Sequence, residues 1–371
     1  MTARRVPFLS LVPGSGDPGD SDQADVRAAI DRVIASGWFV LGPEVDAFET
    51  EFAAAMGAAH AVGVGTGTDA LALILRALGI GPGDEVITTP LSAAYTALAV
   101  LMVGARPVFA DVDPVRLTLD ANKIAPLIGP RTRAILPVHL YGQAADMTAI
   151  AAVAARHNLT IVEDCCQAHL ATERGRPVGT IGIAGAFSFY PTKNLGALGD
   201  GGAIVTNDGA LADRVKRLRN GGQTDRYHHQ EAGINSRLDE MQAAILRARL
   251  PRLGPWTARR RALASRYRAG LKNAVGMPGI EALAESDPGH VYHLFVVRST
   301  ARAVLQTSLA ARGVETLIHY PVPIPQQPAV AAAHPQECPI ATRACGEVLS
   351  LPMHPGLSDA DVDYVVTSCA H

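Results

Sequence analysis

The N-terminal part of the chain has a helical pattern of apolar residues. Apolar positions from Val26 to Ile34 recur every three or four residues, and Gly37 follows where a left-handed helix cap is favoured. Pro43 opens a second stretch of this kind, which Gly57 ends. We therefore expect two helices before the first strand.

From His60 onward, short apolar runs alternate with helical patterns. The predicted strands are HAVGVG, DEVITT, RPVFADV, AILPVHLYG and LTIVEDCC. Continuous apolar strands separated by helices are typical of an α/β protein with a mostly parallel central sheet covered by helices on both faces. Such sheets carry their chemistry at the carboxyl ends of strands. The segments of interest are therefore 65–68, 141–143, 164–169 and 188–193.

The alternating pattern weakens near residue 250, where Pro251, Gly254 and Pro255 lie close together. A basic helix, the predicted strand VYHLFVV and a further helix follow. We therefore expect a large domain over residues 1–250, with the helical segment at its start, and a smaller C-terminal α+β domain over residues 251–371.

Composition narrows the class of partner. The net charge of -2 gives no field that would attract nucleic acid or an anionic membrane. No apolar run approaches the roughly 20 residues that span a bilayer, and no signal-peptide core follows the N-terminus. The five cysteines are an odd number, which favours a reduced, cytoplasmic protein. A small-molecule substrate is therefore expected.

Lys193 is the first candidate for chemistry. It stands in GAFSFYPTKNLGALGDGG, among small residues, aromatic residues and turn formers. An exposed loop lysine is the ordinary interpretation of such a residue. A lysine that forms a Schiff base is the alternative, and it requires a lowered pKa and a cofactor to react with.

Asp164 favours the second interpretation. It follows the apolar strand LTIVE, so it is predicted at the edge of the sheet and partly desolvated. A buried carboxylate needs a cationic partner or several hydrogen-bond donors. The protonated pyridine nitrogen of pyridoxal phosphate is such a partner, and the cationic ring then serves as an electron sink. Lys193 and Asp164 together therefore predict pyridoxal phosphate as the cofactor.

The phosphate of that cofactor also needs a site. In GVGTGTDAL a strand leads into a helix, so the amides near Gly67, Thr68 and Asp69 and the Thr68 hydroxyl are predicted to face an anion. Ser188 adds a hydroxyl at the same edge. The same glycines loosely fit a dinucleotide fingerprint, but the next strand, VITT, has no acidic residue at its carboxyl end. A nicotinamide cofactor is therefore the weaker alternative.

A metal site is a further alternative. Cys165, Cys166 and His169 lie close together in the sequence. Neighbouring residues on a strand point to opposite faces, and no second pair of ligands follows at zinc-finger spacing. We therefore predict no metal site.

Several motifs in order carry a family resemblance. They include TGTDAL, GDEVITTP, PVHLYGQAADM, VEDCCQAH, FSFYPTKNLGALGDGGA and INSRLDEMQAAIL. With them the chain resembles the DegT/DnrJ/EryC1/StrS family of pyridoxal-phosphate-dependent sugar aminotransferases over nearly its whole length. The resemblance implies the fold type I aminotransferase architecture and a homodimer with active sites shared between subunits.

The resemblance also assigns residues. It implies that Lys193 bonds to the aldehyde of the cofactor and that Asp164 pairs with the pyridine nitrogen. Gln167 would lie near the phenolic oxygen, and Asn235 would reach the phosphate in the other subunit. Gly67, Thr68 and Ser188 match phosphate-binding positions. His319, Tyr320 and Tyr190 match positions in the substrate pocket.

The expected reaction moves an amino group, by family analogy from glutamate, to a nucleotide-linked ketosugar. Tyr190 resembles enzymes that aminate the C3 ketone of a deoxyhexose, with C4 amination as the alternative. A sugar dehydratase, in which histidine replaces the lysine, and a non-catalytic cofactor-binding regulator are weaker alternatives.

Two positions depart from the family. Ala93 stands where a residue usually stacks on the cofactor, leaving Tyr95 or another ring for that role, and Pro325 replaces a histidine in HYPVPIPQQP.

Overall fold

The computed structural model describes residues 4–10, 22–273, 279–331 and 336–370. Much of the N-terminal stretch considered for a targeting signal, residues 1–3 and 11–21, lies outside the described residues. Within the described ranges, no helix combines the length and the apolar character that crossing a membrane requires.

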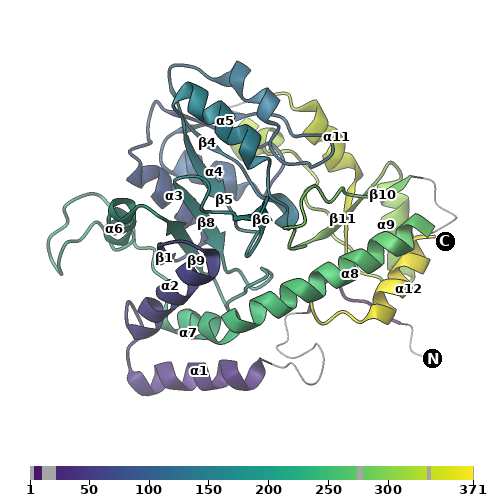
Figure 1. Cartoon of the computed structure of the whole chain (residues 1–371), viewed down its shortest axis with the longest axis horizontal. Coiled ribbons are helices and arrows are strands. Elements are labelled where there is room, and N and C mark those ends of the chain that lie inside the picture. Colours follow the sequence, from purple (N-terminus) through teal and green to yellow (C-terminus); the bar gives the residue numbers. More distant parts are fainter. Residues whose placement is uncertain (1–3, 11–21, 274–278, 332–335, 371) are drawn as a thin grey trace.

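Two helices precede the first strand, as predicted. Helix α1 spans Gln23–Ser36 and α2 spans Pro43–Met56. Gly37 and Gly57 end them with φ of 66° and 69°, which only glycine adopts without strain. Both helices pack on α7 (Glu240–Arg249), whose buried Glu240 accepts hydrogen bonds from three amides at the start of α2 (Figure 1).

The described residues form a central sheet of seven strands. Its order is β1 (His60–Val64), β9 (Gly202–Thr206), β8 (Ala184–Ser188), β5 (Thr160–Asp164), β4 (Thr132–Leu136), β2 (Glu85–Thr88) and β3 (Arg106–Phe109). Strand β9 runs antiparallel to both of its neighbours, and the remaining pairs are parallel. The carboxyl ends of β1, β8 and β5 therefore meet at one edge, where β9 begins.

Helices cover both faces of this sheet, which confirms the predicted layers. On one face, α3 (Gly67–Ala77), α4 (Tyr95–Met102) and α6 (Gly209–Leu218) share a continuous apolar core with the strands. On the other face, α5 (Met147–His157) covers the β2–β5 half, and α2 with α7 covers the β8–β9 half.

The C-terminal part adds a smaller antiparallel sheet in the order β10 (Ile280–Ala282), β11 (Phe295–Ser299) and β12 (Val348–Leu351). Its helices are α8 (Leu253–Asn273), α9 (Arg302–Ala311), α10 (Pro328–Ala331), α11 (Pro339–Glu347) and α12 (Asp359–Cys369). Short 3-10 helices lie at Ala121–Lys123, Ala125–Leu127, Leu140–Gly142, Leu250–Arg252 and Ile324–Gln326. The division of the chain after residue 250 stays a prediction.

The predicted strand VYHLFVV was wrong in its first four residues. Strand β11 begins only at Phe295. The preceding residues bond instead to the loop that follows β4 in the central sheet. Val291 N donates to Gly142 O at 2.9 Å, and Leu294 N donates to Tyr141 O at 3.3 Å. The first half of the apolar run thereby joins the C-terminal part to the edge of the central sheet.

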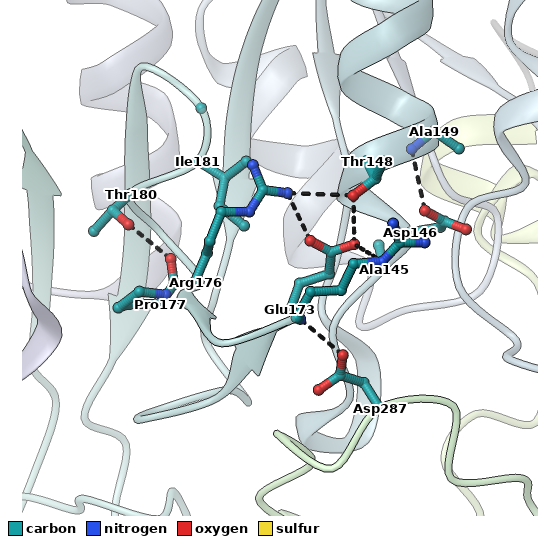
Figure 2. A network of polar contacts seen from close by, with 12 residues as sticks. Ala145, Asp146, Thr148, Ala149, Glu173, Arg176, Pro177, Thr180, Ile181 and Asp287 are labelled. Carbon is teal, nitrogen blue, oxygen red and sulfur yellow. Dashed lines mark hydrogen bonds and ion pairs between the residues drawn. The ribbon is translucent and has the colours of Figure 1, made fainter.

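A polar network holds the short hairpin of β6 (Thr172–Glu173) and β7 (Arg176–Pro177) in place (Figure 2). The buried Glu173 carboxylate accepts hydrogen bonds from Thr148 Oγ1 on α5 at 2.8 Å and from Arg176 Nη2 at 2.6 Å. Asp287 accepts from Arg174 N at 2.8 Å. The hairpin thus connects α5 to the segment that leads into residues 291–294.

A glycine at the start of β9 gives a test of this packing. A Cβ on Gly202 would lie 2.4 Å from the carbonyl carbon and oxygen of Thr66, which are backbone atoms with little freedom to move. We expect Gly202→Ala to lower the free energy of unfolding by about 1–3 kcal/mol, measured by urea denaturation. The control is Gly254→Ala, because nothing lies within 4 Å of its added Cβ. Equal stability of the two variants would contradict the packing.

Candidate active site

Lys193 lies in the loop that follows β8. Its backbone N–H donates to Tyr190 O at 2.8 Å, and its side chain is partly buried. Burial lowers the pKa of the Lys193 amine, while Cys166 and the carboxylate of Asp164 partly oppose this shift. The lysine is therefore biased toward the neutral form that nucleophilic and base chemistry requires.

Asp164 is the last residue of β5 and is 5% exposed. Its Oδ2 accepts a hydrogen bond from Thr96 Oγ1 at 2.8 Å, and its Oδ1 accepts from Cys166 N at 3.1 Å. Within the described ranges, Asp164 forms no ion pair with an arginine, lysine or histidine closer than 4.0 Å. This buried carboxylate therefore has two donors and retains the capacity to pair with a cation.

Gln167 connects Tyr141, in the loop after β4, to the predicted substrate segment. Its Oε1 accepts from Tyr141 N at 2.7 Å, and its Nε2 donates to Tyr320 Oη at 2.9 Å. The Tyr141 hydroxyl in turn donates to the carbonyl of His319. Burial raises the pKa of Tyr320 to about 12 and lowers the pKa of His319 to about 4, so both side chains are neutral near pH 7.

The predicted phosphate site lies at the start of α3. Thr66 caps this helix, because its Oγ1 accepts from Asp69 N at 3.0 Å. The prediction that the Asp69 amide faces an anion was therefore wrong. Within the described part of the chain, the amides of Gly67 and Thr68 donate to no protein group. They are the two first-turn donors still available to an anion.

Ser188 completes this corner of the site. A Cβ on Gly67 would lie 2.8 Å from Ser188 Cβ and 2.7 Å from Cys166 Sγ. The absence of a side chain on Gly67 therefore lets the helix start, the end of β8 and the residues after β5 come together. Gly67 and Ser188 therefore meet beside Cys166, whose backbone N–H binds Asp164.

Asn235 and Tyr95 have no described contact with this cluster, and Tyr190 contacts it only through its backbone, whose carbonyl accepts from Lys193 N at 2.8 Å and whose N–H donates to Ser188 Oγ at 3.4 Å. Asn235 is exposed, Tyr190 is 52% exposed, and Tyr95 is 63% exposed. Stacking of Tyr95 or another ring on the cofactor, in place of a residue at Ala93, stays a prediction. The roles of Asn235 and Tyr190 stay predictions.

Thr96 and His293 contribute to the site but were not singled out by the sequence analysis, whereas Tyr141 lies in the segment 141–143 named there. Thr96 binds Asp164, and Tyr141 binds Gln167. His293 Nδ1 lies 3.1 Å from Asn194 Oδ1 and acts as the donor, since Asn194 Nδ2 donates to Val291 O at 3.2 Å. Tyr141 lies in a segment that the sequence had indicated, and Asn194 lies next to Lys193. Thr96 and His293 had no such signal, because their contacts join residues far apart in the chain.

The cysteines do not group as the metal alternative required. Cys165 is buried in the core beside His139 and Glu163, whereas Cys166 faces Gly67. The Glu163 carboxylate accepts from His139 Nε2 at 2.9 Å and from the amides of Gly179, Ile181 and Gly182 at 2.7–2.8 Å. These bonds account for the burial of Glu163 without a metal ion.

Known proteins share this sequence and fold. Residues 20–370 match the DegT/DnrJ/EryC1/StrS aminotransferase family. A dTDP-3-amino-3,4,6-trideoxy-alpha-D-glucose transaminase from Streptomyces venezuelae is 50% identical over 95% of this chain and 92% of its own length. The erythromycin biosynthesis sensory transduction protein EryC1 from Saccharopolyspora erythraea is 50% identical over 98% of each chain.

The fold agrees with a solved structure from the same group. The crystal structure of S. venezuelae DesV in complex with a ketimine intermediate superposes with a TM-score of 0.93 at 48% identity, over 99% of each chain. The predicted aminotransferase fold is therefore confirmed.

A buried histidine below the site predicts a pH dependence of stability. His169 is packed among aromatic rings, with Phe187 at 5.3 Å and Phe189 at 5.8 Å between centroids. Burial, with the charge of Lys193 acting in the same direction, lowers the pKa of His169 to about 3. Between pH 6.5 and about 3 the unfolded chain therefore binds a proton here that the folded chain does not, so stability falls on acidification.

We expect His169→Leu to remove this share of the pH dependence, up to about 1.4 kcal/mol per pH unit below 6.5. Urea denaturation at pH 7.0 and 5.5 measures it. His157→Leu, at the exposed end of α5, is the control. An equal acid-induced loss in wild type and His169→Leu would contradict the prediction.

Proposed function

The chain belongs to the DegT/DnrJ/EryC1/StrS aminotransferase family and is a pyridoxal-phosphate enzyme, and we propose that it transfers an amino group from glutamate to the C3 keto group of a nucleotide-linked deoxyhexose. The observation that supports this most directly is the partly buried Lys193 amine, whose pKa burial lowers and on which the buried Asp164 carboxylate acts electrostatically. Transamination on pyridoxal phosphate requires such a lysine of lowered pKa, together with a carboxylate that is free to pair with the cationic ring.

The residues present fit the cofactor. Asp164 would pair with the protonated pyridine nitrogen, and Gln167 would lie near the phenolic oxygen. The free amides of Gly67 and Thr68, with the Ser188 hydroxyl, would bind the phosphate. When bound, the cofactor withdraws electrons from the donor's α-carbon and so acidifies its proton.

Lys193 then has a second role as the base. Its neutral amine would take the proton from the donor's α-carbon and pass it to the bound cofactor, and it would carry a proton in the opposite direction when the ketosugar is aminated. Thr96 and the Cys166 amide keep the Asp164 carboxylate in place throughout. Asn194, held by Val291 and His293, restrains the loop that carries the base.

The proposed sugar site includes the segment of His319 and Tyr320. Gln167 and Tyr141 hold the segment with His319 and Tyr320 against the cofactor side of the site. C3 is the proposed position, because the S. venezuelae relative is named for a 3-amino sugar. C4 amination is the alternative. A dehydratase is disfavoured, since Lys193 stands where such relatives carry histidine.

The proposed assembly is a cytoplasmic homodimer with shared sites. Asn235 is exposed in the segment after α6, and the loop that precedes it projects from the body of the chain (Figure 1). An exposed asparagine on such a segment is suited to reach the cofactor phosphate in a second copy. The five cysteines are free, in keeping with a reducing compartment.

A regulatory role is the second candidate, because one relative carries the name of a sensory transduction protein. Such a protein would bind the cofactor but would not exchange amino groups. The complete set of Lys193, Asp164 and Gln167 favours the enzyme.

Lys193 carries the first test of the proposal. We expect borohydride to fix pyridoxal phosphate on Lys193 of the wild-type protein and the visible absorbance of the cofactor to be lost in Lys193→Ala, together with transamination. Peptide mass mapping and absorbance spectra measure both effects. Lys216→Ala, on the exposed side of α6, is the control and keeps the label. A label on another lysine would reject the assignment.

The substrate is tested with a panel of nucleotide-linked 3-keto and 4-keto hexoses. With glutamate as the donor, mass spectrometry is expected to detect an amino sugar from the 3-keto compounds and 2-oxoglutarate in equal amount. Amination of the 4-keto compounds alone would reject C3. No exchange with any ketosugar, in a protein that binds the cofactor, would favour the regulator.

A further inference from the structure

Ser236 ties the proposed phosphate loop to a distant part of the chain. The side chain is 4% exposed. Its Oγ accepts a hydrogen bond from Gly65 N at 2.9 Å and donates to Asp69 Oδ2 at 2.8 Å. One hydroxyl therefore binds both Gly65, just after β1, and Asp69, in the first turn of α3. Gly67 and Thr68 lie between these two residues.

The position of Ser236 is itself fixed. Its backbone N–H donates to Arg219 O at 2.9 Å, and Arg219 Nη1 donates to Gly63 O at 2.6 Å, in the strand that leads into the turn. Arg219 also forms a buried ion pair with Glu49, which accepts from Gly63 N at 2.8 Å. Arg219 and Glu49 thus fix Ser236 relative to the end of β1, and the Ser236 hydroxyl in turn holds Gly65, just after that strand.

The bond to Asp69 has an electrostatic consequence. Asp69 lies in the first turn of α3, where a carboxylate is attracted to the same amides that bind an anion. Ser236 holds the Asp69 carboxylate on the Gly65 side of the turn. A released Asp69 would compete with a phosphate for the amides of Gly67 and Thr68.

Asn235, the preceding residue, faces the other way. Residues 234–236 pair with residues 219–221 in a short antiparallel bridge, so successive side chains point to opposite sides. Ser236 is buried against its own chain and Asn235 is exposed. The side chains of Asn235 and Ser236 therefore cannot contact the same binding site.

We propose that Ser236 is a positioning residue for the phosphate site of its own chain, in contrast to Asn235, which the family resemblance already assigns to the site of a second copy. The assignment of Asn235 rests on the proposed homodimer. The assignment of Ser236 rests on contacts within one chain and is tested separately.

The first measurement is the affinity of the apoprotein for pyridoxal phosphate, followed by absorbance. Ser236→Ala is expected to weaken binding about tenfold, the effect of one lost hydrogen bond to a charged group. Ser368→Ala, a buried serine (3% exposed) on α12, is the control and leaves the affinity unchanged. Adding Asp69→Ala to Ser236→Ala restores most of the affinity, because the competing carboxylate is gone. Unchanged binding in Ser236→Ala, or no recovery in the double variant, would overturn the proposal.

Mixed dimers then separate the two sites. Each pairs a Lys193→Ala chain with a second variant, and borohydride labelling of the remaining Lys193 at limiting cofactor reports binding. With Asn235→Ala as the second chain, labelling is expected at the wild-type level, since the partner supplies Asn235. With Ser236→Ala it stays weak, since Ser236 acts within its own chain. Wild-type labelling in the Ser236 mixture would overturn the inference, whereas weak labelling in the Asn235 mixture alone would reject the shared dimer and leave Ser236 assigned.

Discussion

The loss of water around the Lys193 amine is the constraint on which the site depends. Burial lowers its pKa, and the carboxylate of Asp164 limits that shift. A fully solvated lysine would stay protonated and inert at neutral pH, whereas a lysine buried without a nearby carboxylate would tend to expel its proton altogether. Burial and the Asp164 carboxylate together keep the Lys193 amine able both to bond to an aldehyde and to carry a proton.

This balance requires several distant parts of the chain to meet. Strand β5 supplies Asp164, α4 supplies Thr96 to hold it, and residues 291–293 hold Asn194 beside the lysine. The antiparallel strand β9 matters because Gly202 packs against the Thr66 carbonyl and brings the start of α3 to the end of β8. The phosphate corner and the lysine loop are therefore positioned by the same sheet edge.

The sequence was sufficient for the parts of this arrangement that depend on local patterns. Strand ends fall at Asp164 and Ser188, and the helix caps fall at Gly37 and Gly57, because periodicity and turn residues are read within a few positions. Thr96, His293 and Ser236 could not be predicted in this way, and of Tyr141 only its segment, 141–143, was predicted to matter. Each acts through a partner tens to hundreds of residues away, and nothing in its neighbours specifies that partner.

The two sides of the site differ in how tightly the chain holds them. On the cofactor side, Asp164, Gln167 and the start of α3 are all fixed by hydrogen bonds to buried groups. On the substrate side, Tyr190 is half exposed and contacts the cluster only through its backbone, and the segment of His319 and Tyr320 is held through Tyr141 and Gln167. A change of sugar therefore requires changes in few restrained residues, whereas a change of cofactor chemistry would disturb the whole sheet edge. This asymmetry explains why the cofactor follows from the residues alone, while the choice of C3 over C4 depends on the relatives.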